Sequence, residues 1–306
     1  MPSDPLWPNR DRLVLSAGHG SMLLYSLLHL SGYDLPLDEL KAFRQLGSQT
    51  PGHPEWGHTA GVETTTGPLG QGFGNAVGMA IAETKAAAHF NTDRHTVYDH
   101  YTYCIAGDGC MMEGVTSEAA SLAGHLQLGK LIVFYDDNKI SIDGSTSITF
   151  TEDVGARFRA YGWHVQDGDA YDVNEIRRMV KRAKKETDKP SLISLRSVIG
   201  KGAPSKADSS KIHGAPLGPD EAAAAKRGLG LPEDEEFTIP PEARDFFTKR
   251  RKEWGENFRE WVHCFQAWSE ANPDLRQEWV AFQSGQPWQE LKMPEYSPGD
   301  TVATRK

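Results

Sequence analysis

The chain has 306 residues, of which 38% are hydrophobic, and its formal net charge at pH 7 is -9. A net negative charge argues against general nucleic-acid binding, and no apolar run approaches the about 18 residues that a membrane span needs. The opening MPSDPLWPNRDRL lacks the apolar core of a secretory signal, and the 3 cysteines follow no zinc or disulfide spacing. We therefore expect a cytoplasmic protein that binds neither membranes nor nucleic acid.

Short apolar runs alternate with helical patterns between Asp11 and Gly200. A helix is expected to begin near Gly70, and two others are expected over 114–128 and 173–185. The expected strands are short apolar runs that cover 101–108, 130–137, 162–166 and 190–198. This alternation predicts an α/β fold with three layers, in which helices cover both faces of a mostly parallel, doubly wound sheet.

The composition changes after Gly200. Residues 201–220 are rich in Gly, Pro and Ser, so we expect a long loop, which in a compact domain is usually functional or disordered. Residues 241–283 predict a charged, aromatic-rich helical region that is broken near Asn272 and Pro273. The last 20 residues or so are expected to form a linker.

Two oxygen-bearing side chains follow neighbouring predicted strands. Asp108 lies in Gly107-Asp108-Gly109 at the end of one strand, and Asn138 follows the run LIVFYDD. Ligands of open parallel sheets bind beyond the carboxyl ends of the strands, so both side chains should face one crevice. Mg²⁺ prefers oxygen ligands and usually keeps phosphate oxygens beside them, so the pair predicts a cation that holds a diphosphate. The alternative is a simple Asp-Gly turn between a strand and a helix.

A glycine-rich loop leads into the helix expected near Gly70. Its glycines allow close approach of a ligand, and the helix N-terminus carries a partial positive charge. The loop does not match the dinucleotide-binding fingerprint, because Gly74 falls one place too early after Gly70 and Gly72. A nicotinamide cofactor is therefore disfavoured.

Three histidines lie in loops flanked by glycine or proline: His19 in SAGHGSM, His53 in TPGHPE and His213 in KIHGAPLG. Such positions offer few packing partners, so these side chains are candidates for binding phosphate or sugar hydroxyls or for moving protons, although structural roles remain open. Glu113 is expected in the first turn of the helix after Asp108. It either complements that helix N-terminus or contacts a catalytic group at a subunit boundary.

The motifs together resemble one known family. In chain order, SAGHGSM, TPGHPE, GVETTTGPLGQG, GDGCMMEG, YDDNKISIDG and HGAPLG are similar to the N-terminal, thiamine-diphosphate-binding domain of transketolases. The related deoxyxylulose-phosphate synthases would instead carry a GHSSTS-like stretch in place of TTTGPLGQG. The resemblance implies a thiamine-diphosphate-binding domain over 1–235, a helical extension of that domain over 236–285, and a linker over 286–306 toward a pyrimidine-binding domain.

The resemblance also implies roles for individual residues. Asp108, Asn138 and the carbonyl of Ile140 would hold Mg²⁺ or Ca²⁺. The cofactor would be contacted by Asp108 and Asn138 and by His19, Gly67, Pro68, Leu69, Gly107, Gly109, Glu113 and His213, with Gly67 to Leu69 against the thiazolium and aminopyrimidine. The catalytic candidates are His213 and His53, which would also face the sugar, and Glu113, which would meet the partner subunit's catalytic glutamate.

The implied activity is transfer of a two-carbon ketol unit between sugar phosphates, in the pentose phosphate pathway, by a homodimer. The chain begins beyond the place of the family's SGHPG segment and stops about where the pyrimidine-binding domain would begin. We therefore expect a fragment, a truncated product or one subunit of a split enzyme, inactive unless another chain supplies the pyrimidine-binding and C-terminal domains. The alternatives are a non-catalytic cofactor-binding module and a ketol transferase like dihydroxyacetone synthase.

Overall fold

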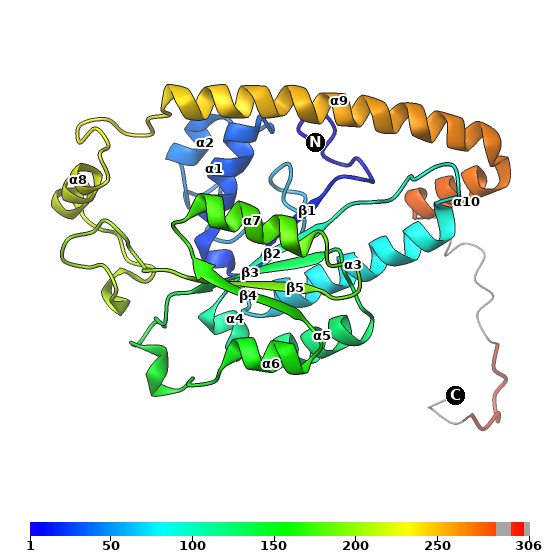
Figure 1. Ribbon diagram of the computed structural model, residues 1–306, viewed down its shortest axis with the longest axis horizontal. Helices are drawn as coiled ribbons and strands as arrows, with labels where there is room; N and C mark the ends of the chain where they lie inside the picture. Colours follow the sequence, from blue (N-terminus) through cyan, green and yellow to red (C-terminus); the bar gives the residue numbers. More distant parts are fainter. Residues whose placement is uncertain (286–294, 303–306) are drawn as a thin grey trace.

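The computed structural model describes residues 1–285 and 295–302. Within these residues, one five-stranded sheet has the order β1-β2-β3-β5-β4, and all neighbouring strands are parallel (Figure 1). The strands are β1 (Arg12–Leu15), β2 (Thr102–Gly107), β3 (Leu131–Asp137), β4 (His164–Asp169) and β5 (Ser191–Arg196). The predicted α/β class is confirmed.

Four strands lie where the sequence predicts them, although β4 runs three residues beyond the predicted end at 166. The edge strand β1 is not predicted by the sequence pattern. Its four residues are too few to show a strand period by themselves, and only pairing with β2 identifies them as a strand. This strand leads directly into the segment that carries His19.

Helices cover both faces of the sheet, as Figure 1 shows. The first face packs against α3 (Gln71–Phe90), α5 (Gly114–His125) and α6 (Val154–Ala160), which contribute Phe73, Ala120 and Phe158 to one buried cluster. The second face packs against α7 (Val173–Ala183), through Met179, and against α1 (Ser21–Ser31), through Tyr25. The predicted helices at Gly70, 114–128 and 173–185 are therefore confirmed. The short elements are η1 (Gly18–Gly20), α2 (Leu37–Lys41), α4 (Asp108–Met112) and η2 (Thr146–Ile148).

The C-terminal part is helical and breaks where the sequence predicts. After the loop region come η3 (Ser210–Ile212), α8 (Pro219–Gly228), α9 (Pro241–Ala271) and α10 (Pro273–Ser284). Pro273 opens α10 because proline fits the first turn of a helix but not its interior. Trp268 of α9 is buried against Phe90 at the end of α3, so this extension packs on the domain. Most of the predicted linker, at 286–294 and 303–306, lies outside the described residues.

None of the helices in the described ranges combines the length and apolar composition that crossing a bilayer requires.

His100 makes the stability of the fold depend on pH. Its side chain is 5% exposed, and its buried Nδ1 has no hydrogen-bond partner among the described residues. Burial, reinforced by Arg12 and Lys130, lowers the pKa of His100 from 6.5 to about 3. The unfolded chain therefore takes up this proton first as the pH falls. We expect the free energy of unfolding to drop by about 2 kcal/mol between pH of about 7.5 and about 5.

Urea denaturation of the wild-type chain at the two pH values measures this loss. The variant His100→Gln should lose stability less steeply over the same interval, whereas His125→Gln, at an exposed position of α5, should keep the wild-type slope. A wild-type slope in His100→Gln would contradict the assignment.

Candidate functional site

The candidate site lies at the carboxyl ends of β2 and β3. The sheet register pairs Gly107 with Asp136, so the segments that follow the two strands begin side by side. Asp108 is the first residue of α4, directly after β2. In Figure 1 this edge of the sheet faces left, toward the loop between β5 and α8.

The Asp108 carboxylate is 3% exposed and is held by three donors. The Tyr135 hydroxyl donates to Oδ1 at 2.7 Å, and the backbone N–H groups of Asn138 and Lys139 donate to Oδ2 at 3.1 and 3.0 Å. Lys139 has a φ of 63°, a left-handed conformation within the turn that presents these two successive N–H groups. A carboxylate offers about four acceptor positions, so this one keeps a single position free of protein donors.

Burial is also the main influence on the charge of Asp108. It raises the pKa of this carboxyl, an effect that the Tyr135 hydrogen bond opposes and the nearby Asp137 charge reinforces. A cation beside Asp108 would favour the ionised form and relieve this cost.

Asn138 and Ile140 supply further oxygens in the turn after β3. The Asn138 side-chain oxygen accepts from the Ile140 N–H at 2.9 Å, and Ile140 is bridged to Ser145. No three His, Cys, Asp or Glu side chains are grouped to hold a metal anywhere in 1–285 or 295–302. A cation here would therefore need amide, carbonyl and diphosphate oxygens in addition to Asp108, a donor set that suits Mg²⁺ or Ca²⁺.

Glycines bring the loop before α3 against these strand ends. A Cβ placed on Gly109 would lie 2.7 Å from Leu69 Cδ1, and one on Gly18 would lie 2.7 Å from Thr66 Oγ1 and 3.0 Å from the Gly67 nitrogen. The missing side chains thus let three separate chain segments meet and leave backbone groups close to the crevice.

The three loop histidines lie together although they are far apart in the sequence. The rings of His19 and His213 stack with centroids 5.1 Å apart. A Cβ placed on Gly67 would lie 3.6 Å from His53 Cγ, so His53 borders the loop before α3 that contains Gly67. Burial lowers the pKa of His19, and positive charge on His213 or His53 would lower it further. The buried Nδ1 of His213 has no partner among the described residues, which leaves it available to a ligand.

The prediction that Glu113 lies in the first turn of the helix after Asp108 is wrong. The helix after β2 is the short α4, which begins at Asp108 and ends at Met112, so Glu113 does not lie in its first turn. Glu113 is extended, with φ of -73° and ψ of 137°, and forms the junction before α5. Glu113 packs beside Gly70, since a Cβ placed on Gly70 would lie 2.8 Å from Glu113 Cβ. The Glu113 side chain is exposed. Glu113 is the N-cap of α5, a position with an extended backbone, and this conformation ends α4 before the next helix begins.

Two residues of this region were missed by sequence reasoning. Tyr135 lies two residues before Asp137 in β3, and a period of two would have placed both side chains on the face that meets Asp108. Thr66 is buried with Oγ1 unpartnered among the described residues, next to Gly67. No sequence signal distinguishes it from its neighbours Thr64 and Thr65.

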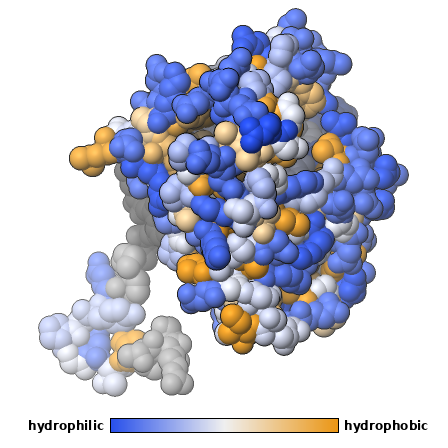
Figure 2. Space-filling model, turned by 90° about the vertical axis from the view of Figure 1, so that its left-hand side faces the viewer, coloured by the Kyte–Doolittle hydropathy of each residue, from blue (hydrophilic) through white to orange (hydrophobic). Residues whose placement is uncertain are grey.

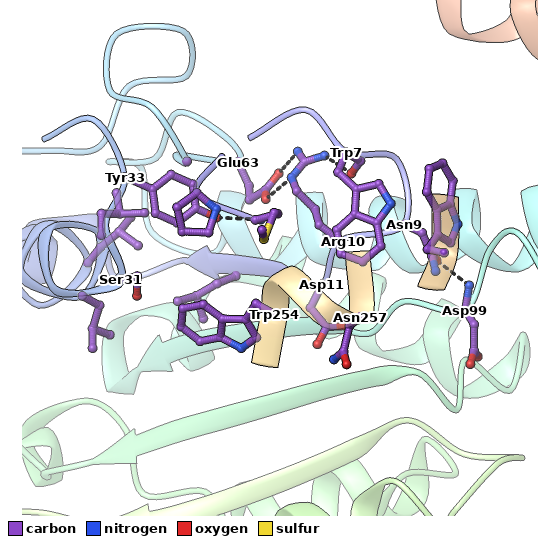
Figure 3. Close-up of a pocket in the computed structure, with 18 residues that line it drawn as sticks. Trp7, Asn9, Arg10, Asp11, Ser31, Tyr33, Glu63, Asp99, Trp254 and Asn257 are labelled. Carbon is purple, nitrogen blue, oxygen red and sulfur yellow. Dashed lines mark hydrogen bonds and ion pairs between the residues drawn. The ribbon is translucent and has the colours of Figure 1, made fainter. Parts of the chain in front are cut away.

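A large cavity lies elsewhere in the molecule. It has a volume of about 510 Å³ and is bounded by the N-terminal segment, α1 and α9. Figure 3 shows the Arg10–Glu63 ion pair at one side and Asp11, Trp254 and Asn257 at the other. None of the residues that line this cavity belongs to the predicted site. The predicted site is therefore assigned from its side-chain chemistry and not from the size of a cavity.

The fold is that of an α/β protein with a parallel sheet, and the candidate site lies where such sheets bind ligands, at the carboxyl ends of the strands. Residues 1–287 match the family described as transketolase, thiamine diphosphate binding domain. The chain therefore belongs to the transketolase family and contains its thiamine-diphosphate-binding domain.

Named relatives agree with this placement. Transketolase of Treponema pallidum is 53% identical over 309 residues, which cover 99% of this chain and 47% of the relative. Transketolase 1 of Escherichia coli is 56% identical over 271 residues, covering 86% and 41% of the two chains. A solved transketolase of Pichia stipitis with sedoheptulose-7-phosphate superposes with a TM-score of 0.93 at 47% identity, covering 99% of this chain and 46% of that one. The chain thus spans about half the length of these relatives.

Proposed function

We propose that the chain binds thiamine diphosphate together with Mg²⁺ or Ca²⁺ at the carboxyl ends of β2 and β3. Asp108, the Asn138 side-chain oxygen and the Ile140 carbonyl hold the cation, and Gly107 and Gly109 face the diphosphate. The observation that carries the proposal is the buried Asp108 carboxylate, whose three protein donors leave one acceptor position. A diphosphate requires a cation here, because charges about 4 Å apart repel by roughly 4 kcal/mol at a dielectric constant of about 20.

The rest of the cofactor would contact the loop before α3 and the histidine pair. Gly67, Pro68 and Leu69 line the thiazolium and aminopyrimidine, and His19 and His213 contact the cofactor beside them. The stacked His19 and His213 rings and the unpartnered Nδ1 of His213 support this arrangement. Because its pKa is lowered, His19 is neutral near pH 7 and can accept or donate a hydrogen bond without adding charge.

The proposed activity is transfer of a two-carbon ketol unit between sugar phosphates, and the proposed setting is the pentose phosphate pathway in the cytoplasm; membership of the transketolase family supports the transfer reaction. When bound, the thiazolium supplies the electron sink for this chemistry. His53 borders the loop before α3, His213 stacks on His19, and both bind the sugar hydroxyls or move protons at them. The Pichia stipitis complex with sedoheptulose-7-phosphate supports a ketose phosphate as substrate.

A second chain is part of the proposal. Glu113 and the nearby Val115 are exposed, and so are Ile142 and Ile148 in the segment after β3. Figure 2 views the face of the molecule that lies at the left in Figure 1. On this face, hydrophobic residues are scattered in small groups among hydrophilic ones. The proposal is a homodimer in which Glu113 contacts a catalytic group of the partner, or a complex with a chain that supplies the pyrimidine-binding and C-terminal domains; the exposure of Glu113 beside the loop before α3 supports it.

Calorimetric titration of the 306-residue chain with thiamine diphosphate tests the cofactor site. We expect binding in the presence of Mg²⁺ and none in the presence of a chelator, because the cation neutralises the repulsion between Asp108 and the diphosphate. Equal binding under both conditions would contradict the site. The same chain should give no turnover of xylulose 5-phosphate with ribose 5-phosphate until a chain with the other domains is added, and turnover by the chain alone would refute that part.

A further inference from the structure

We infer that Lys206 is a positioning residue, which closes the loop that carries His213 and so holds this histidine at the cofactor site. The inference rests on the proposed function, since His213 would contact thiamine diphosphate there. Lys206 lies seven residues before His213 and outside the motifs that carry the resemblance to transketolases. Its role is to place a side chain that binds the cofactor, not to touch the cofactor itself.

The Lys206 side chain joins the two ends of this loop. Its ammonium donates to the carbonyl oxygen of Leu217 at 2.7 Å and, more weakly, to that of Pro216 at 3.4 Å. The chain from 206 to 217 is therefore closed on itself, as in an Ω-loop, and His213 lies within the closed segment. We call residues 206–217 the histidine loop.

Glu221, in the first turn of α8, holds the same end of the histidine loop from the other side. Its Oε1 accepts from the N–H groups of Ser205 at 2.8 Å and Lys206 at 3.2 Å, and its Oε2 accepts from the Ser205 hydroxyl at 2.8 Å. The Ser205 N–H hydrogen bond is the main cause of a lowered pKa for the Glu221 carboxyl, which is therefore ionised near pH 7. Lys206 is thus fixed at its backbone by α8, and its ammonium fixes the chain that enters α8.

Short contacts within the histidine loop connect Lys206 to His213. The Ser209 hydroxyl donates to the Lys206 carbonyl oxygen at 2.8 Å. The next residue, Ser210, accepts from the His213 N–H at 3.0 Å. The His213 ring then stacks on His19 with centroids 5.1 Å apart. Closure of the loop at Lys206 and the position of the His213 ring are therefore parts of one arrangement.

The histidine loop has little apolar support. All of its residues are at least partly exposed, and Ala225 is the buried residue of α8. Figure 1 shows the segment between β5 and α8 to the left of the sheet. In the described part of the chain, no backbone hydrogen bond links 203–208 to 214–219. The side-chain bonds of Lys206 and Glu221 therefore hold the base of the loop together.

The variant Lys206→Met removes the ammonium and keeps most of the apolar stem. A loop that is closed for part of the time presents His213 to the cofactor for only that fraction, and the apparent Kd rises in inverse proportion. In calorimetric titration with thiamine diphosphate in the presence of MgCl₂, we expect a Kd about 5-fold higher than that of the wild type, which corresponds to a loop closed about one-fifth of the time.

Lys226→Met is the matched control. Lys226 lies in the last turn of α8, and its ammonium donates to the carbonyl oxygens of Glu235 at 2.8 Å and Glu233 at 3.3 Å. It therefore closes a loop in the same way, but after α8 rather than before it. This variant should keep the wild-type Kd.

A double-mutant cycle with His213→Ala separates positioning from a general structural role. His213→Ala alone should raise the Kd, because it removes a cofactor contact. Addition of Lys206→Met to His213→Ala should then change the Kd by less than about 2-fold, since Lys206 acts through the missing ring. A wild-type Kd in Lys206→Met would overturn the inference, and so would an equal increase in the presence and absence of His213.

Glu221→Ala opens the base of the loop from the side of α8 and leaves the Lys206 side chain intact, so it tests the inference even if Lys206→Met does not fold. Its Kd should also rise in the wild-type background and not in the His213→Ala background. No rise, or the same rise in both backgrounds, would contradict the role of the loop closure. Failure of the wild type to bind thiamine diphosphate would instead refute the proposed function, so the two failures are distinct.

Discussion

Replacing Asp108 by Asn should abolish measurable binding of thiamine diphosphate in the presence of Mg²⁺, with an affinity loss of at least about 100-fold. The amide has no charge to balance the cation. It also has one oxygen for three converging donors, the Tyr135 hydroxyl and two backbone N–H groups. At least one buried donor loses its partner, so the free energy of unfolding should fall by about 1–3 kcal/mol. Calorimetry and urea denaturation measure the two effects.

Glu83→Gln separates the two effects. Glu83 is as buried as Asp108 and accepts from the Lys130 ammonium at 2.7 Å, but Lys130 lies at the amino-terminal end of β3, away from the cofactor site. Loss of the Glu83 charge should destabilise the chain and leave its affinity for the cofactor unchanged. Cofactor binding by Asp108→Asn, or its loss in Glu83→Gln, would contradict the assignment of Asp108.

Gly124→Ala should be strongly destabilising, because Gly124 lies where α5 touches the end of α6. A Cβ on Gly124 would lie 1.8 Å from the Tyr161 carbonyl oxygen, so the end of α5 and the end of α6 could no longer touch. Both helices are anchored, because Ala123 and Phe158 are fully buried in the same cluster. The backbone cannot yield as a flexible side chain would, and we expect a loss of about 3 kcal/mol in the free energy of unfolding.

Gly78→Ala supplies the control within the same layer. Gly78 lies on the exposed side of α3, and a Cβ there would meet nothing within 4 Å. Alanine should stabilise this helix by about 0.5–1 kcal/mol, because glycine loses more conformational entropy on folding. Thermal and urea denaturation of the two variants should therefore shift in opposite directions. Loss of stability in both would show that contact with Tyr161 is not the cause.

Local patterns in the sequence were sufficient for the fold class. The strands β2, β3 and β5 are apolar runs long enough to be recognised, and the helix after Gly70 has a clear helical period. The same patterns placed Asp108 and Asn138 at strand ends, where the structure brings them into hydrogen-bond contact. Burial preference is a property of each residue and its immediate neighbours, so it can be read without knowing what packs against it.

The tertiary structure decided which distant segments meet. The sequence names His19, His53 and His213 separately, but only packing brings His19 and His213 to a centroid distance of 5.1 Å. It alone places the Tyr135 hydroxyl on Asp108 and turns the chain at Glu113 between two helices. These outcomes depend on contacts between residues far apart in the chain, whose geometry no local period encodes. The sequence by itself therefore determined the chemistry available at the strand ends, and long-range packing determined how that chemistry is oriented.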